Sequence, residues 1–165
     1  MKTLIPLATD IGAILKERGE TIAVAESSAG GLISAALLAV PGASAYYKGG
    51  GVVYTASAFK GLMGLERSDI EGMRSSTEPY ACVLARTIKI RLRSSWGLSE
   101  TGASGPTGNP YGDAAGHTCV ALVGQTEDGP IELSRTLETG SPDREANMYR
   151  FAQEALELMH SVIKI

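Results

Sequence analysis

The stretch Ala25–Gly31, which reads AESSAGG, constrains the fold of this chain more than any other part of its sequence. A short apolar run at 21–25 precedes the stretch, and the run LISAALL at 32–38 follows it. Apolar runs of these lengths on either side of a glycine-containing turn predict a strand, a tight turn and a helix. We therefore expect at least one strand–helix unit of the kind that builds α/β folds.

The residue types in this turn leave several functions open. Gly30 and Gly31 allow the backbone to bend and to approach a ligand closely. The amides that begin the following helix have no partner inside it, and with the positive helix end they could seat a phosphate or carboxylate. The hydroxyls of Ser27 and Ser28 could add donors, or one of them could be a nucleophile. The simplest alternative is a plain strand–helix turn that serine caps.

Hydrophobic periodicity and turn residues divide the rest of the chain into helices and strands. The predicted helices are 4–18, 30–40, 57–63, a long helix that starts at 76–79, and a last helix that starts at Ser141–Pro142; the predicted strands are 21–26, 49–55, 98–102, 117–123 and 131–138. Asp128–Gly129 predicts a hairpin turn between the last two strands. This order predicts one domain over 1–165 of the α/β class, a three-layer α/β/α sandwich with a mixed β-sheet.

Composition excludes several classes of partner. A net charge of −3 argues against a broad nucleic-acid surface, so the basic residues of the long helix are interpreted as a solvated face. No run approaches the ~20 apolar residues of a membrane span, so we expect no membrane partner. Two cysteines without CxxC spacing and no ligand cluster predict no metal and no cofactor, and a reducing cytoplasm is the expected location.

A second glycine-rich segment, Thr101–Asn109 with the sequence TGASGPTGN, predicts a loop. Its hydroxyls and amides could form an anion-binding nest, although an ordinary surface loop is the simpler alternative. The only histidines are His117, interpreted as packed or hydrogen-bonded, and His160, interpreted as solvated. A nucleophilic serine without histidine requires lysine or tyrosine, and Lys60 and Tyr54 are the nearest candidates in sequence.

Six segments together resemble the signature motifs of the CinA C-terminal domain family. They occur in the family's order and span nearly the whole chain. They are Ala25–Gly31 (family AESCTGG), Pro41–Tyr46 (xPGSSxxF), Gly50–Thr55 (GGxVxYS), Thr101–Pro106 (TGIAGP), Gly116–Thr118 (VGTV) and Asp143–Arg144 (GDR).

The resemblance implies a homodimeric nicotinamide-nucleotide amidase that needs no metal. Characterised members hydrolyse the carboxamide of nicotinamide mononucleotide (NMN), a small-molecule nucleotide, to nicotinate mononucleotide and ammonia. Carried over to this sequence, Ser27 is the nucleophile or a substrate-orienting hydroxyl, Tyr54 and Lys60 serve proton transfer or positioning, and Arg144 contacts the phosphate. The remaining substrate-binding residues are Glu26, Ser28, Gly30, Gly31, Thr101, Gly102, Ser104 and Gly105.

The chain departs from the family motifs at three positions of the predicted site. Ala29 stands where the family has threonine, Phe59 where it has lysine, and Thr107 where it has an acidic residue. Lys60 follows one residue later, which on a helix turns the side chain by about 100°. These changes keep open a second function, a catalytically silent nucleotide-binding or regulatory domain, because a fold can persist when its chemistry is lost.

Overall fold

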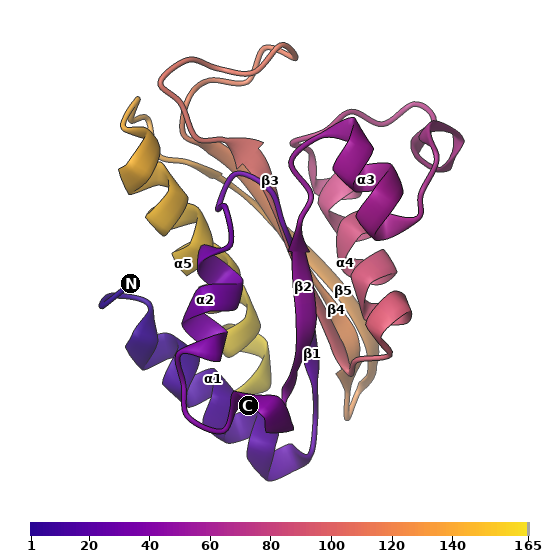
Figure 1. Cartoon of the computed structure of the whole chain (residues 1–165), viewed down its shortest axis with the longest axis vertical. Coiled ribbons are helices and arrows are strands. Elements are labelled where there is room, and N and C mark those ends of the chain that lie inside the picture. Colours follow the sequence, from indigo (N-terminus) through magenta and orange to yellow (C-terminus); the bar gives the residue numbers. More distant parts are fainter. Residues whose placement is uncertain (165) are drawn as a thin grey trace.

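Five strands form one mixed sheet in the order β2-β1-β3-β4-β5, and the computed structural model describes residues 1–164 (Figure 1). In chain order the elements are α1 (Ile5–Arg18), β1 (Ile22–Glu26), α2 (Leu32–Leu38), η1 (Ala43–Ala45), β2 (Tyr47–Val52), α3 (Ala56–Met63), η2 (Arg67–Ile70), α4 (Glu78–Leu92), β3 (Trp96–Ala103), β4 (His117–Thr126), β5 (Gly129–Glu138) and α5 (Arg144–Ile163). The predicted order of helices and strands is confirmed.

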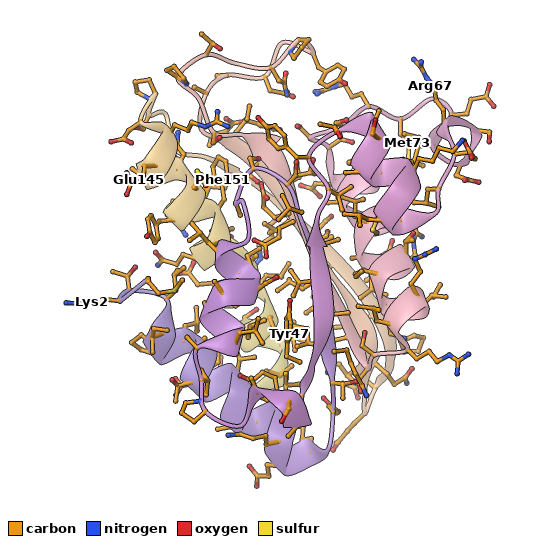
Figure 2. The ribbon with its side chains drawn as sticks, in the orientation of Figure 1. Lys2, Tyr47, Arg67, Met73, Glu145 and Phe151 are labelled. Atoms are coloured by element: carbon orange, nitrogen blue, oxygen red, sulfur yellow. The ribbon has the colours of Figure 1, made fainter. Side chains whose placement is uncertain are left out.

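Helices cover both faces of the sheet, which makes the predicted three layers (Figure 1). The helices α1, α2 and α5 pack on one face, where the largest buried cluster includes Ile11, Ile33 and Phe151. Figure 2 shows Phe151 reaching from α5 toward this core. The helices α3 and α4 pack on the other face around Phe59 and Leu84. The buried apolar residues of α5, from Phe151 to Ile163, therefore belong to the core. No helix in the described part is long and apolar enough to cross a membrane.

The connections on either side of β1 create a crevice at one end of the sheet. β1 pairs in parallel with β2 and with β3, while β3, β4 and β5 pair antiparallel. The chain passes from β1 to β2 on one side and then returns to β3 on the other. In open α/β sheets, ligands bind at the carboxyl ends of the strands where the connections diverge in this way. Here that point lies between the ends of β1 and β3.

The two central strand–helix units differ from the predicted boundaries. α2 begins only at Leu32, because Gly30 and Gly31 have φ of +66° and +97°, outside the helical range. β2 begins at Tyr47, which pairs with Ile22, and ends at Val52. β3 is longer than predicted, because β4 pairs with it from Gly97 to Ala103. Pairing between strands set the bounds of β2 and β3, whereas the two glycines set the start of α2.

The hairpin and the last helix also begin differently from the prediction. Thr126 pairs with Gly129, so the two-residue loop is Glu127–Asp128 and Gly129 already belongs to β5. α5 begins at Arg144 and not at Ser141–Pro142, because the Asp143 carboxylate caps it by accepting the Ala146 amide at 3.1 Å. Aspartate is among the preferred residues at this position.

Candidate functional site

A cavity of about 860 Å³ opens at the carboxyl ends of β1 and β3. The loop after β3 rises above this end of the sheet, and α3 flanks it (Figure 1). Figure 2 shows two of the lining residues, Arg67 and Met73, beside α3. The wall consists of hydroxyl, aromatic, aliphatic and basic residues with one acidic residue and one amide: Ser27, Val53, Tyr54, Thr55, Ala56, Phe59, Lys60, Leu65, Glu66, Arg67, Ile70, Met73, Arg74, Ser75, Ser76, Tyr80, Thr101, Gly102, Asn109, Pro110 and Tyr111.

The two serines of the AESSAGG turn face different environments. Ser27 lines the cavity, and among residues 1–164 its hydroxyl has no hydrogen-bond partner. Ser28 is buried, and its hydroxyl donates to Glu100 Oε1 at 2.9 Å. Ser27 is therefore the serine of this turn that a ligand in the cavity can contact, while Ser28 belongs to the support behind it.

Glu26, the last residue of β1, occupies the helix end that the sequence predicts as an anion seat. Its fully buried carboxylate accepts the amides of Gly31, Ile33 and Ser34 at 3.0, 3.1 and 2.9 Å, and also the Ser34 hydroxyl. The Gly30 amide donates to the Ser27 carbonyl. Of the alternatives that the sequence leaves open, a carboxylate at these amides is therefore the one observed, and it belongs to the chain itself and not to a ligand.

Glu100 is a residue of the site that the sequence analysis missed. It lies on β3, is fully buried, and accepts the amides of Ser27 and Ala29 at 2.9 and 2.8 Å. Burial raises the pKa of its carboxyl, although the hydrogen bonds from the turn partly oppose that rise. The available signal was a single charged residue within the run WGLSETGA, which otherwise reads as a buried strand.

Tyr54 and Lys60 line the same cavity as Ser27 but contact other residues. Tyr54 lies beyond the end of β2, and its hydroxyl accepts a hydrogen bond from Arg144 at 3.2 Å. Lys60 forms an exposed ion pair with Glu66, with Nζ and Oε1 2.9 Å apart. The structure thus brings the three predicted catalytic residues to one cavity without hydrogen bonds among them, and their catalytic roles stay predictions.

The predicted binding residues of the second glycine-rich segment divide into two groups. Thr101 and Gly102 line the cavity, and a side chain at Gly102 would collide with the His117 carbonyl. Ser104 and Gly105 do not line it; the Ser104 side chain is buried, and the Gly105 carbonyl accepts Arg144 Nη1 at 2.6 Å. Arg144 therefore joins the loop after β3 to Tyr54, outside the lining of the cavity.

The three departures from the family motifs lie in different surroundings. Phe59 lines the cavity and stacks on Tyr80, with ring centroids 5.8 Å apart. Ala29 is buried and gives its amide to Glu100, whereas Thr107 is exposed on the loop after β3. Phe59 therefore presents an aromatic surface on the wall of the cavity where the resemblance implies a lysine.

An ionic network holds the loop after β3 against the segment before α4. Arg74 forms a two-point ion pair with Asp113 and lies over the ring of Tyr111 at 5.9 Å. The Arg74 guanidinium lowers the pKa of the Asp113 carboxyl to about 2. Arg74 and Tyr111 both line the cavity, so this network fixes one of its walls. Among residues 1–164, no group of three histidine, cysteine or acidic residues could hold a metal ion.

His117 anchors the base of that wall, as predicted for a hydrogen-bonded histidine. Its two ring nitrogens face the Glu138 carboxylate and, at 2.8 Å, the Ser76 carbonyl. Both partners accept hydrogen bonds, which favours the doubly protonated imidazolium. Burial lowers the pKa of His117, but the contacts with Glu138 and Ser76, together with the charges of Glu138 and Asp113, outweigh it and leave the pKa raised above 6.5.

The raised pKa of His117 predicts a pH-dependent stability. The folded state holds this proton more tightly than the unfolded state, so the stabilisation is complete below pH 6.5 and is lost as pH rises through the higher folded-state pKa. We expect the melting temperature to fall over that window, and His117→Gln to flatten the fall. Melting curves at several pH values measure both slopes, and equal slopes in the two proteins would contradict the assignment.

These features together define an α/β domain whose cavity lies where the strand connections diverge, with the Ser27 hydroxyl on its wall. The sequence model of the CinA C-terminal domain matches residues 4–163. The chain belongs to the CinA C-terminal domain family.

Relatives and solved structures agree with this assignment. A CinA-like protein of Chlorobium limicola is 34% identical over 150 residues, which cover 91% of this chain and 35% of that protein. A CinA-like protein of Gloeobacter violaceus is 37% identical over 134 residues, which cover 81% of this chain and 32% of that protein. The chain thus spans about a third of the length of these curated relatives.

The fold matches solved members of the superfamily. The competence/damage inducible protein CihA of Agrobacterium tumefaciens superimposes with a TM-score of 0.86 at 25% identity, covering 98% of this chain and 96% of that chain. A CinA superfamily protein of Klebsiella pneumoniae gives 0.87 at 20% identity, covering 98% of both chains.

Proposed function

We propose that this domain hydrolyses the carboxamide of NMN to nicotinate mononucleotide and ammonia, with Ser27 as the nucleophile. One observation carries the proposal: the Ser27 hydroxyl is unpartnered within the described residues and lies on a cavity of about 860 Å³ at the divergence of the strand connections. That volume falls within the usual range for small-molecule sites. Membership of the CinA family supports the same reaction.

The wall of the cavity offers groups that suit a pyridine nucleotide. Phe59, Tyr80 and Tyr111 provide aromatic surface for the pyridine ring, and cations stack favourably on such rings. Arg67 brings positive charge to the same cavity, which suits a phosphate, whereas the charge of Arg74 is already paired with Asp113. Because Glu26 fills the end of α2, the phosphate of a bound nucleotide would lie near Arg67 and not at the helix amides. The predicted contact with Arg144 requires the phosphate to extend past the lining of the cavity, beyond Tyr54.

The proposed reaction has two steps. The Ser27 hydroxyl oxygen bonds to the carboxamide carbon, its proton passes to a base and then to the leaving nitrogen, and the carbon–nitrogen bond breaks to release ammonia. Water then hydrolyses the acyl ester, which releases nicotinate mononucleotide and restores the hydroxyl. Tyr54 and Lys60 are the proposed proton-transfer residues, and Lys60 would have to leave Glu66 to take part.

Ammonia release from NMN by the purified protein tests the proposal. We expect turnover that saturates with NMN concentration and yields one nicotinate mononucleotide per ammonia. Nicotinamide riboside, which lacks the phosphate, serves as the matched substrate and should show a higher KM. An absence of ammonia at saturating NMN would reject the amidase function.

A catalytically silent nucleotide-binding domain is the second candidate. Phe59 on the cavity wall and the pairing of Lys60 with Glu66 favour it, because both remove a free lysine from the neighbourhood of Ser27. This candidate predicts that NMN raises the melting temperature without releasing ammonia. A homodimer, which the family resemblance implies, and a cytoplasmic location, which the cysteine usage indicates, remain proposals; sedimentation of the purified chain tests the first.

A further inference from the structure

The Glu100 carboxylate lies directly behind the serine turn and contacts four donors. Oε2 accepts the amides of Ser27 and Ala29 at 2.9 and 2.8 Å. Oε1 accepts the hydroxyls of Ser28 and Thr118 at 2.9 and 3.0 Å. Three of the four donors belong to consecutive residues of the turn, so one buried side chain from β3 fixes the conformation of Ser27–Ala29.

This arrangement leaves one amide of the turn free. Glu100 takes the amides of residues 27 and 29, Glu26 takes those of 31, 33 and 34, and those of 30 and 32 donate to carbonyls inside the turn. Within the part that the structure describes, the Ser28 amide has no acceptor. It is also the amide that follows the Ser27 side chain in the chain.

A free amide beside a nucleophile has a chemical use. When a serine oxygen attacks a carboxamide, negative charge develops on the carbonyl oxygen, and a fixed backbone donor stabilises it. Glu26 and Glu100 accept five of the other amides of residues 27–34, and backbone carbonyls accept the remaining two, those of Gly30 and Leu32. Among the amides of residues 27–34, that of Ser28 is therefore the one left for a carbonyl bound against Ser27.

We propose that Glu100 is a positioning residue for the Ser27-centred reaction: through the amides of Ser27 and Ala29 it holds the turn so that the Ser27 hydroxyl faces the cavity and the Ser28 amide stays free to donate. This inference rests on the proposed function. Glu100 itself does not line the cavity, so it acts through the turn and not on the substrate.

The burial of Glu100 supports a functional reason for its presence. An ionised carboxylate loses its hydration when it is fully buried, and burial is the largest influence on its pKa. An apolar residue of similar size would avoid that cost. Residues that cost stability in this way are found where activity requires a fixed geometry.

Two substitutions separate the geometry from the charge. In Glu100→Gln, the amide oxygen can still accept from Ser27 and Ala29, and the NH2 group can donate to the hydroxyls of Ser28 and Thr118, which also accept. Glu100→Leu keeps the approximate volume and removes all four contacts. Glu20→Leu is the matched control, because Glu20 bonds the Trp96 indole at the opposite end of β1.

The first readout is the division of the effect between kcat and KM. We expect Glu100→Leu to lower kcat for NMN by about 100-fold with little change in KM, because displacing a reacting group by about 1 Å has an effect of that size. Glu100→Gln should remain within a few-fold of the wild type, as should Glu20→Leu. Equal losses in the Gln and Leu variants, or wild-type kcat in Glu100→Leu, would overturn the proposal.

The second readout does not depend on catalysis. Amide hydrogen exchange of segment 27–31, measured without substrate, should be faster in Glu100→Leu and unchanged in Glu100→Gln and Glu20→Leu. If the wild type releases no ammonia, the proposed function fails while this exchange pattern still decides whether Glu100 holds the turn; unchanged exchange in Glu100→Leu rejects it. If Glu100→Leu does not fold, Glu100→Asp, whose shorter side chain cannot reach both amides, replaces it in both measurements with the same expectations.

Discussion

Replacing Ser27 with alanine is expected to reduce ammonia release from NMN by at least about 1,000-fold, which is the scale of losing a nucleophile that acts within a catalytic unit. The Ser27 hydroxyl is unpartnered in the described chain, so its removal breaks no hydrogen bond and the fold should persist. NMN should still raise the melting temperature of Ser27→Ala, because the rest of the cavity is intact. Turnover and thermal shift, measured on the same sample, separate chemistry from binding.

The control for this prediction is Ser57→Ala. Ser57 is exposed on α3 and does not line the cavity, so its loss should leave turnover unchanged. Full turnover in Ser27→Ala would remove the nucleophile assignment. It would also leave water activated by another residue as the route to ammonia.

Replacing Glu26 with alanine is expected to lower the free energy of unfolding by about 3 kcal/mol. The substitution leaves the buried amide of Ile33 and the partly buried amides of Gly31 and Ser34 without an acceptor, and unmet buried donors cost about 1–3 kcal/mol each before relaxation. Relaxation of α2 and entry of water recover part of this loss. Urea unfolding followed by circular dichroism measures the change through the transition midpoint.

Asp143→Ala provides the matched comparison for Glu26. Asp143 also caps a helix, but it is exposed and accepts a single amide, that of Ala146. Loss of an exposed cap costs about 1 kcal/mol. A Glu26→Ala variant no less stable than Asp143→Ala would show that the buried carboxylate is not what fixes the end of α2.

These two predictions concern adjacent residues, and the two substitutions are expected to act for different reasons. Ser27 matters because its hydroxyl is free, whereas Glu26 matters because every donor near it is engaged. From the sequence, both residues are predicted to contact the substrate. The structure separates them, since Ser27 lines the cavity and Glu26 lies buried behind it.

The contacts around the end of β3 likewise join residues that are far apart in the sequence. Thr101 and Gly102 line the cavity as their motif suggests, but Glu100, the residue before them, contacts the serine turn from a sequence distance of about 70 residues. Arg74 and Asp113 likewise meet across 39 residues to hold the loop after β3. No local pattern in the sequence pairs these residues.

The sequence by itself determined the order of the elements, the three layers, and the position of Ser27 after β1. Periodicity and turn residues act over a few positions, so a single chain segment carries them. Only the tertiary structure decided that carboxylates from β1 and β3 take the turn amides, that Arg144 contacts Tyr54, and where β2 and β3 begin and end. Those outcomes depend on strand register and side-chain burial, which bring distant residues together and which no short segment specifies.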